Sequence, residues 1–289
     1  MKILMIGHGM VGHKFIESVL EQAGDDIELT ILAEEPHLAY DRVHLTEYFS
    51  GKSVKDLSLC RSDFADAYGI DLRLNTKAVE IDQLHKTVTT SQGDVLSFDK
   101  LILATGSYAF VPPIPGNDRQ NCFVYRTIED LDAIRAASLN AKTGVVIGGG
   151  LLGLEAAKAL RDLNLETHVV EFAPRLMAVQ IDDLGGRVLR SKIEDLGVKV
   201  HTQKATSSIE DGDSTQHVMK FGDGSVLETD IILFSAGIRP RDELARQSGL
   251  LIGERGGIII NDYCQTSHPD IYAIGECALW DNKIYGLVA

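Results

Sequence analysis

Two glycine clusters carry the clearest chemical signal in the sequence. The segments Gly7–Gly12 and Gly148–Gly153 both have the spacing G-x-G-x-x-G. In this pattern the first glycine permits a tight turn, the second lets a diphosphate approach the backbone, and the third allows a helix to pack closely on a strand. The free amides at the start of that helix then stabilise the phosphates. Each cluster therefore predicts a dinucleotide-binding site.

The residues expected to contact the two ligands belong to these clusters. At the first site they are Gly7, Gly9, Met10, Val11 and Gly12. At the second site they are Gly148, Gly150, Leu151, Leu152 and Gly153. We expect His8 to contribute its backbone rather than its side chain, and we assign it no catalytic role.

An acidic residue follows each cluster at about the 20-residue spacing of a ribose ligand. Glu34 holds this position in the first half and Glu35 is the second choice; the alternative is a solvated acidic pair ahead of a proline turn. Glu171 holds the position in the second half. A carboxylate accepts hydrogen bonds from a ribose 2′-hydroxyl but repels the 2′-phosphate of NADP, and the nearest arginine, Arg175, lies beyond a proline. The second site is therefore predicted to prefer NADH.

The elements around the first cluster form a strand, helix, strand unit. The apolar run Lys2–Ile6 predicts a buried strand, and Glu28–Leu32 predicts a second one. Between them, one apolar stripe at helical spacing predicts a helix: Val11, Phe15, Val19 and Ala23. This is the βαβ arrangement that places a glycine turn at a helix N-terminus.

The same plan returns around the second cluster. Gly144–Ile147 and Thr167–Val170 are the predicted strands, and the helix between them carries Ala156, Leu160 and Leu163. A β-rich meander then follows each unit, with turns at Gln92-Gly93-Asp94 and at Asp223-Gly224. Each meander ends in a buried strand that leads into small residues. The first strand is Leu101–Ala104, followed by Thr105 and Gly106; the second is Ile231–Phe234, followed by Ser235, Ala236 and Gly237.

The predicted fold is therefore α/β, with two Rossmann-like dinucleotide-binding domains that carry β-meander inserts. Residues 117–244 form the second domain, and residues 1–116 and 245–289 form a discontinuous first domain. The proline-rich segment 112–116 is the expected crossover. The apolar runs Ile258–Ile260 and Ile271–Ile274 are expected to return to the first domain.

Charge and composition exclude several classes of partner. The formal net charge of −14 repels phosphodiester backbones and anionic lipids, so no nucleic acid or membrane partner is expected. No apolar run approaches the length of a membrane span, and Met1 leads directly into a strand without a secretory leader, which favours the cytoplasm. The four cysteines are far apart and are expected to be buried, reduced thiols, with no metal site and no redox dithiol. They are Cys60, Cys122, Cys264 and Cys277.

Beyond these patterns, the whole sequence resembles the two-dinucleotide-domain flavoprotein reductases with the glutathione reductase fold. The resemblance rests on both glycine clusters, on Ala104-Thr105-Gly106, on Ser235-Ala236-Gly237 and on Tyr272–Glu276. It implies that the first domain binds FAD, that the second binds the nicotinamide dinucleotide, and that Glu276 binds the ribityl chain of FAD. Further implied contacts are Val79, Ala104, Thr105, Gly106 and Gly275 for FAD, and Ala236 and Gly237 for NAD.

Within this family the segment Glu34–Leu45 is similar to the ferredoxin reductase and apoptosis-inducing factor branch, in which the residue matching Arg42 contacts FAD. The branch usually has a lysine near the flavin where this chain has Glu47, and an aspartate where it has Glu276. Glu155 matches a position that faces the flavin. Two nearby carboxylates would raise one pKa by repulsion; the alternative is that Glu47 simply faces solvent.

The chain looks most like the amino-terminal flavin module of the assimilatory-type nitrite reductase large subunits, which continue into iron–sulfur and sirohaem regions. The resemblance implies an enzyme that passes a hydride from NADH to FAD and then electrons to an iron–sulfur or haem acceptor, either a downstream domain or a small carrier. This segment alone is not expected to reduce nitrite. Two alternatives are a stand-alone NADH:ferredoxin or rubredoxin reductase and a non-catalytic flavin-based redox sensor. The family's C-terminal interface domain, which often builds a homodimer, is expected to be absent from this sequence.

Overall fold

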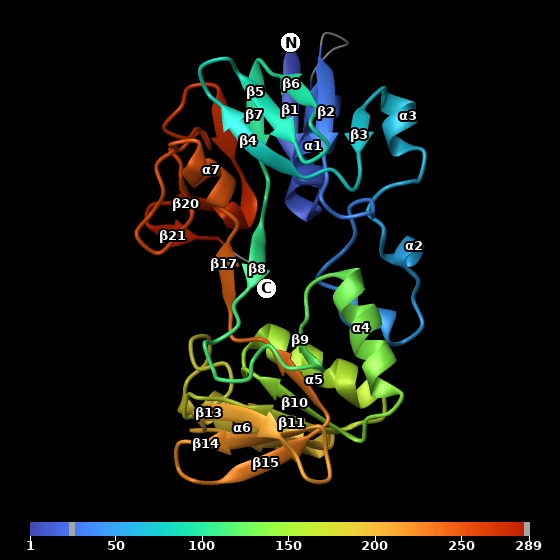
Figure 1. Cartoon of the computed structure of the whole chain (residues 1–289), viewed down its shortest axis with the longest axis vertical. Coiled ribbons are helices and arrows are strands. Elements are labelled where there is room, and N and C mark those ends of the chain that lie inside the picture. Colours follow the sequence, from blue (N-terminus) through green and yellow to red (C-terminus); the bar gives the residue numbers. More distant parts are fainter. Residues whose placement is uncertain (23–26, 286–289) are drawn as a thin grey trace. The chain divides into compact units, whose positions relative to one another are not determined.

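The computed structural model describes residues 1–22 and 27–285, which form two compact units (Figure 1). Unit 1 comprises Met1–Asp41, Lys55–Tyr108 and Arg239–Ala289, and unit 2 comprises Arg42–Val54 and Ala109–Ile238. Each unit contains a five-stranded parallel sheet and a three-stranded antiparallel meander. The predicted α/β class with two Rossmann-like halves is confirmed.

The parallel sheet of unit 1 has the order β19-β7-β1-β2-β3. Its strands are β1 (Lys2–Ile6), β2 (Glu28–Leu32), β3 (Asp71–Arg73), β7 (Lys100–Leu103) and β19 (Ile271–Ala273). Helix α1 (Met10–Gln22) connects β1 to β2. The predicted helix is confirmed, and Phe15 of the predicted stripe packs partly buried on the core. The fully buried residues are Gly12, His13 and Ile16, whereas Val11 is exposed, and Ala23 lies outside the described residues. The reason is that the third glycine of the cluster sets the face that packs on the sheet.

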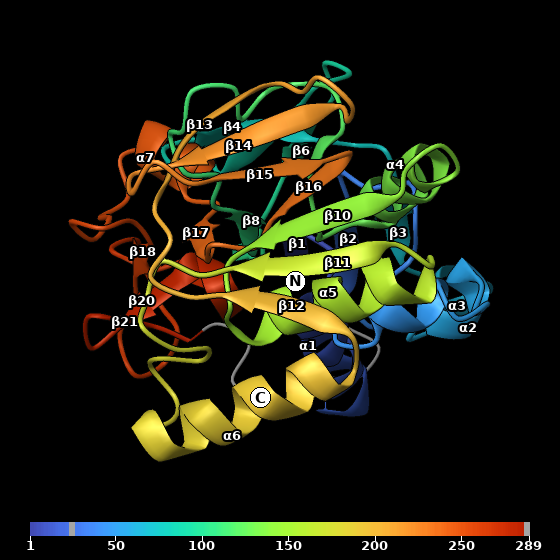
Figure 2. The ribbon, with the colours of Figure 1, turned by 90° about the horizontal axis from the view of Figure 1, so that it is seen from below.

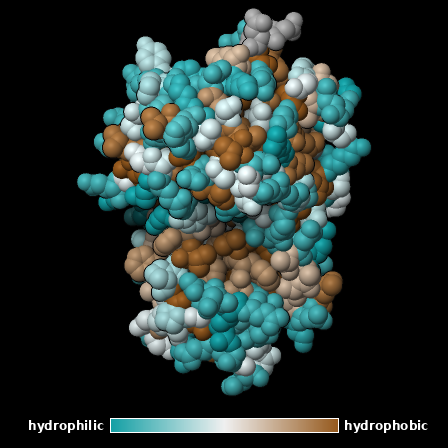
Figure 3. All heavy atoms as spheres, turned by 45° about the horizontal axis from the view of Figure 1, so that its top comes forward, coloured by the Kyte–Doolittle hydropathy of each residue, from teal (hydrophilic) through white to brown (hydrophobic). Residues whose placement is uncertain are grey.

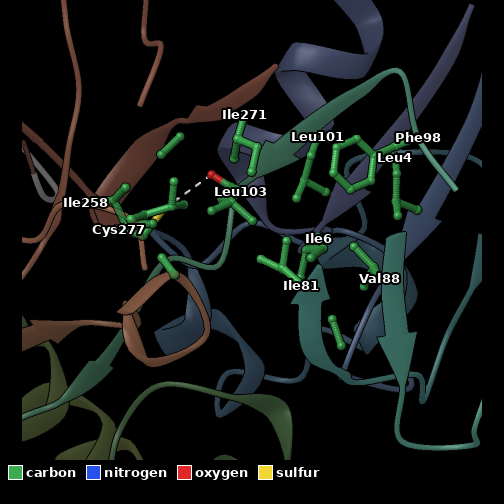
Figure 4. Close-up of a cluster of buried hydrophobic side chains, with 14 of the residues drawn as sticks. Leu4, Ile6, Ile81, Val88, Phe98, Leu101, Leu103, Ile258, Ile271 and Cys277 are labelled. Atoms are coloured by element: carbon green, nitrogen blue, oxygen red, sulfur yellow. Dashed lines mark hydrogen bonds between the residues drawn. The ribbon is translucent and has the colours of Figure 1, made fainter. Parts of the chain in front are cut away.

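Side chains of β1 alternate between two cores. Ile3 and Met5 pack with Ile16 of α1 on one face, and Leu4 and Ile6 pack on the other face. The second face is covered by the meander β4 (Ala78–Asp82), β5 (Thr87–Thr90) and β6 (Val95–Ser97). Figure 4 shows this second core, in which the Cys277 thiol lies 3.3 Å from the Leu103 carbonyl oxygen.

The parallel sheet of unit 2 has the order β12-β11-β10-β16-β9. Its strands are β9 (Cys122–Val124), β10 (Thr143–Ile147), β11 (Glu166–Val170), β12 (Val198–His201) and β16 (Ile231–Phe234). Helix α5 (Leu151–Asp162) contacts β10 and β11, and α6 (Asp183–Asp195) contacts β12 (Figure 2). The meander is β13 (Thr206–Asp211), β14 (His217–Phe221) and β15 (Val226–Thr229).

The two sheets are copies with one change of connection. In both, the order around the central strand is the same: β3-β2-β1-β7 in unit 1 corresponds to β12-β11-β10-β16 in unit 2. The fifth strand differs in its place along the chain. In unit 1 it is β19, which follows the other four strands in sequence, and in unit 2 it is β9, which precedes them. The return of the chain to unit 1 was predicted from the run that forms β19.

The remaining elements are short, except for helix α4, which begins in unit 2 with a capping box at Thr127. They are η1 (Leu45–Tyr48), α2 (Val54–Leu57), α3 (Phe64–Tyr68), β8 (Ser107–Ala109), α4 (Ile128–Ser138), β17 (Ile238–Pro240), α7 (Glu243–Gln247), β18 (Ile258–Ile259), η2 (Gly275–Cys277), β20 (Ala278–Trp280) and β21 (Lys283–Ile284).

The unit boundaries lie earlier in the chain than the predicted ones at 116 and 244. Val111 and Ile114 pack in the core of unit 2, and the Ile209 amide donates to the Pro115 carbonyl at 2.9 Å. The proline-rich segment is thus part of unit 2 rather than a bare crossover. At the return, the Gly257 amide donates to the Asp242 carboxylate at 2.6 Å, which ties that segment to unit 1.

Unit 2 also includes Arg42–Val54, which the sequence had placed in the first domain. Two tyrosine hydroxyls explain the difference. Tyr48 donates to Asp132 of α4 at 2.6 Å, and Tyr125 donates to Thr46 at 3.1 Å. These bonds hold η1 to the body of unit 2.

The described surface mixes hydrophilic and hydrophobic side chains, as the face in Figure 3 illustrates. Among the helices within residues 1–22 and 27–285, none combines the length and the apolar character that a membrane crossing requires. The four cysteines are unpaired, but only Cys277 is buried; Cys60, Cys122 and Cys264 are half-buried. The prediction that all four are buried was therefore wrong, because three of them lie in short strands and loops near the surface.

Two candidate dinucleotide sites

The first glycine loop, in unit 1, is shaped by the close approach of two backbone segments. Gly7 has φ of +106°, and a Cβ at this position would lie 2.2 Å from the Ala104 carbonyl oxygen. A Cβ on Gly12 would lie 2.7 Å from the Gly7 carbonyl oxygen. Both positions therefore require glycine. At Gly9, by contrast, no atom lies within 4 Å of an added Cβ. The loop is thus tight toward the protein and open where a diphosphate would approach, which fits the dinucleotide that the sequence predicts.

Two further predicted motifs meet at this loop. The Ala104 amide donates to the Ile6 carbonyl at 2.8 Å, which places Ala104-Thr105-Gly106 beside Gly7. A Cβ on Gly275 would lie 3.3 Å from Val11, so Gly275 packs against the start of α1. Glu276 accepts a 2.6 Å hydrogen bond from the hydroxyl of Ser107. The structure therefore brings together segments from residues 7, 105 and 275 of the chain.

The predicted ribose ligand of unit 1, Glu34, lies at the end of β2 between two cations. Its carboxylate accepts from Lys77 at 3.1 Å and from Arg241 at 2.8 Å. Partial burial opposes ionisation, but the hydrogen bonds and charges of these two residues hold the pKa of Glu34 below its usual value. Glu35 is engaged separately, since it accepts from the Tyr40 hydroxyl at 2.7 Å.

Val79, another predicted FAD contact, lies two residues beyond Lys77 in the chain, and Lys77 is one of the two cations that contact Glu34. It is the extra residue of a β-bulge, because Ala78 pairs with Thr90 and Glu80 pairs with Thr89. A bulge leaves its extra residue outside the ladder of hydrogen bonds. The backbone of Val79 is therefore suited to a ligand contact.

The second glycine loop, in unit 2, repeats the geometry of the first. Gly148 has φ of +121°, and an added Cβ would lie 2.2 Å from the Ser235 carbonyl oxygen. A Cβ on Gly153 would lie 2.0 Å from the Gly148 carbonyl oxygen, whereas at Gly150 no atom lies within 4 Å. Gly150 is also the N-cap of α5, so Leu151 and Leu152 occupy the first turn of the helix.

Glu171, the predicted ribose ligand of unit 2, accepts hydrogen bonds from this loop and from the segment that follows β11. One carboxylate oxygen accepts from the Gly149 amide at 2.5 Å and the other accepts from the Ala173 amide at 2.7 Å. The nearest arginine is already engaged: Arg175 pairs with Asp183 at 2.7 Å and donates to the Ile181 carbonyl at 3.0 Å. Arg175 also lines a pocket of about 260 Å³ beside the loop.

The segment after β16 closes the same site. The Ser235 amide donates to the Ile147 carbonyl at 2.9 Å, which sets Ser235 beside Gly148. Ala236 and Gly237 follow in exposed positions, and Gly237 has φ of +109°. Their place relative to Gly148 matches that of Thr105 and Gly106 relative to Gly7.

The residues expected near the flavin ring, Arg42, Glu47 and Glu155, belong to unit 2. Arg42 donates to the Arg126 carbonyl at 3.3 Å. Glu47 forms an ion pair with Lys52, and its side chain is 39% exposed. Burial raises the pKa of Glu155, with an opposing contribution from His44. Of the two carboxylates, Glu47 is thus paired with a cation, and Glu155 is the one with the raised pKa.

Sequence reasoning missed Lys77, Arg241 and Ser107, which contact the predicted acids. Lys77 and Arg241 are both far from Glu34 in sequence, and surface cations carry no pattern of their own. Ser107 directly follows Ala104-Thr105-Gly106, so its proximity to that motif was the available signal.

Comparison with known proteins places these sites in context. The profile of the pyridine nucleotide-disulphide oxidoreductase family matches residues 1–288. The chain is 54% identical over 290 residues to the NADH nitrite reductase large subunit of Escherichia coli strain K12, a match that covers all of this chain and 34% of that protein. It is 38% identical over 289 residues to the assimilatory nitrate reductase electron transfer subunit of Bacillus subtilis strain 168, covering all of this chain and 37% of that protein. The chain thus spans about a third of the length of these relatives.

Among solved structures, the ferredoxin reductase of Rhodopseudomonas palustris superimposes with a TM-score of 0.89 at 29% identity. That match covers 97% of this chain and 69% of the other. A water-forming NADH oxidase of Lactobacillus brevis, solved with NADH bound, also matches, with a TM-score of 0.88 at 25% identity over 96% of this chain and 62% of the other. A neighbour with this fold therefore binds NADH, the dinucleotide that the second glycine loop is predicted to bind.

Proposed function

Because the chain belongs to the pyridine nucleotide-disulphide oxidoreductase family, we propose that it oxidises NADH and passes the electrons through FAD toward the iron–sulfur and haem centres of a nitrite reductase. The observation that carries the proposal is the 54% identity, across the whole chain, to one third of an NADH nitrite reductase large subunit. The chain is an oxidoreductase with FAD and NAD(H) as cofactors. Nitrite reduction itself is not assigned to this chain.

Unit 1 is proposed to hold FAD. Gly7 and Gly9 give the diphosphate access to the backbone, and the N-terminus of α1 supplies amides to it. Glu34 accepts the ribose hydroxyls, and Lys77 and Arg241 keep this acid ionised. Glu276 is proposed for the ribityl chain. The flavin, when bound, accepts a hydride from the nicotinamide and releases electrons singly, while the protein positions and tunes it.

Unit 2 is proposed to hold NADH rather than NADPH. Gly148 and Gly150 admit the diphosphate, and Glu171 presents a carboxylate to the ribose. A 2′-phosphate would meet this negative charge, and Arg175 is already paired with Asp183 and the backbone. The proposed preference for NADH therefore rests on the carboxylate of Glu171, which repels a 2′-phosphate, and on Arg175, whose guanidinium is already paired.

The flavin-proximal roles of Arg42, Glu47 and Glu155 remain proposals based on the family resemblance. What supports Glu155 is its half-buried position on α5 and its raised pKa, which lets it keep a proton to a higher pH than an exposed acid. Glu47 has Lys52 as its partner, so its charge is already balanced.

An anaerobic NADH titration of the FAD-reconstituted chain tests the proposal. We expect the visible flavin absorbance to bleach with one equivalent of NADH, and the chain to reduce ferricyanide with NADH but to leave nitrite unchanged. A chain that cannot be reconstituted with FAD, or whose bound FAD is not reduced by NADH, would contradict it.

A second candidate is a stand-alone NADH:ferredoxin reductase, which the structural match to a ferredoxin reductase favours. Adding a [2Fe–2S] ferredoxin to the reduced chain separates the two. Rapid ferredoxin reduction, at rates well above those with ferricyanide, supports this second candidate. Slow reduction supports an acceptor that is normally part of the same longer protein.

A further inference from the structure

Three potential metal ligands from separate segments of unit 1 lie close together at the first glycine loop. His8 lies within that loop, His13 lies in the second turn of α1, and Cys60 lies between α2 and α3. One ligand atom from each of these residues lies within 4.8 Å of the other two. The two imidazole rings meet edge to face with centroids 5.7 Å apart.

Both histidines are buried, and three of their four ring nitrogens lack a hydrogen-bond partner among the described residues. The side chains of His8 and His13 belong to residues that are 8% and 4% exposed. Both ring nitrogens of His8 and the Nδ1 atom of His13 have no hydrogen-bond partner. Buried polar atoms are almost always paired, and an exception calls for an explanation such as a bound ion. These nitrogens therefore point to a ligand rather than to ordinary packing.

The surrounding structure holds the three side chains in place. Phe64 packs edge to face on His13, with ring centroids 5.1 Å apart. The Ser58 hydroxyl donates to the Cys60 carbonyl at 2.7 Å, and the adjacent Leu59 amide donates to the Ala39 carbonyl at 2.8 Å. The ligands thus come from α1, from the glycine loop directly before it and from an anchored segment, and such support gives the rigidity that a metal site needs.

We propose that His8, His13 and Cys60 form a binding site for one Zn²⁺ ion. Two imidazoles and a thiolate are ligands that Zn²⁺ prefers, and water would complete the tetrahedron. The carboxylate of Glu17 lies 3.7 Å from the Nε2 atom of His13, so an acid stands beside the cluster. Together with the Cys60 thiolate it balances the charge of the ion. Binding releases the Cys60 thiol proton to solvent, since the thiolate is the ligand.

The ring nitrogens of His8 are available to an ion. Neither of them has a hydrogen-bond partner among the described residues, and a neutral imidazole nitrogen has the lone pair that binds a cation. The site goes beyond the proposed function, because no electron transfer requires it. The side chain of His8 belongs to the zinc site, whereas the glycine loop contacts the diphosphate through its backbone.

Cobalt provides the test, because a thiolate bound to Co²⁺ gives a near-ultraviolet charge-transfer band. The full chain is stripped with a chelator, kept reduced and titrated anaerobically with Co²⁺ and then with Zn²⁺. We expect the band to saturate at one Co²⁺ per chain and to disappear when one equivalent of Zn²⁺ is added. Cys60→Ser should lose the band and bind Zn²⁺ at least about 100-fold more weakly.

Cys122→Ser is the matched control, because Cys122 is also a free, half-buried thiol but lies in unit 2. It should keep the band and the Zn²⁺ affinity. Circular dichroism checks the fold of each variant, and His13→Gln provides an independent ligand change with the same expected loss. A wild-type chain without the band, or a band that survives in Cys60→Ser, overturns the proposal. Bleaching of the flavin by NADH is measured separately, so failure of the metal site and failure of the proposed function remain distinguishable.

Discussion

The glycines of the two loops are constrained by different parts of the molecule. Gly7 and Gly148 must be glycine because of their positive φ and the carbonyl oxygens that lie against them. Gly12 and Gly153 must be glycine because a helix and a turn touch there. At Gly9 and Gly150 an added Cβ would meet no protein atom within 4 Å, so these two glycines leave room for a ligand. The motif thus divides into glycines that shape the loop and glycines that leave it open to the diphosphate.

The substitution Gly150→Ala tests this division. Its φ is −80°, which alanine adopts readily, and its Cβ would enter open space. We expect the free energy of unfolding to fall by no more than about 1 kcal/mol, because alanine is a poorer N-cap than glycine. The Kd for NADH should rise at least about tenfold, which equals about 1.4 kcal/mol. Fluorescence titration with NADH and urea denaturation measure the two quantities. An unchanged Kd would show that the NADH diphosphate does not bind at this loop.

The site residues that the sequence can propose are those whose spacing the backbone imposes. A dinucleotide turn sets the spacing of the glycines and of the acids Glu34 and Glu171, and their contact with a ligand stays a prediction. The partners of those acids were not found. Arg241 reaches Glu34 only because the chain returns to unit 1 late, and such a contact leaves no local pattern. The partners of Glu171 are backbone amides, which no side-chain pattern encodes.

At the scale of the elements, each loop depends on the contact between a helix and the turn that precedes it. The first turn of α5 lies very close to Gly148. A Cβ added to Gly153 would lie 2.0 Å from the carbonyl oxygen of Gly148. Gly153→Ala should therefore destabilise unit 2 by about 1–3 kcal/mol through overpacking, although alanine favours helices. Urea denaturation measures the change, and Gly150→Ala, three residues earlier, is the control. Equal stability of the two variants would contradict the close contact.

A histidine pair makes the edge of the unit 2 sheet sensitive to pH. His168 of β11 and His201 of β12 stack with centroids 5.2 Å apart, and their ring nitrogens lie 2.9 Å from each other. Burial lowers the pKa of both rings below the usual value of about 6.5, and for His201 the proximity of His168 adds to the effect.

The sign of the pH dependence follows from these lowered pKa values. Below about pH 6.5 the unfolded chain binds more protons than the folded chain, so the stability of unit 2 is fully present above that pH and is lost as the pH falls. Hydrogen exchange of peptides from β11 and β12, compared between pH 7 and pH 5 after correction for intrinsic rates, should show the loss. His201→Gln should weaken the dependence. If the pH dependence of exchange is the same in His201→Gln as in the wild type, other titratable groups cause it.

At the scale of the whole molecule, duplication made most of the architecture predictable. Two copies of one pattern gave two parallel sheets with their meanders, and β1, β2 and β16 begin and end where the patterns do. The exchange of Arg42–Val54 into unit 2 was not predictable, because it depends on hydroxyl contacts from Tyr48 and Tyr125 to distant residues. Segment membership is decided by such contacts rather than by position in the chain.

Because each unit carries a complete glycine loop with its own acid and closing segment, the two binding sites should respond separately to mutation. Gly9→Ala, which also enters open space, should weaken FAD binding at least about tenfold and leave the NADH affinity of the apoprotein unchanged. Gly150→Ala should do the reverse. In the double variant the two losses of binding free energy should add, since different residues form the two glycine loops. Titration of each apoprotein variant with each cofactor measures all four affinities. Weakened NADH binding in Gly9→Ala would mean that the loop of unit 1 shapes the site of unit 2, and the division of the chain into an FAD unit and an NADH unit would then fail.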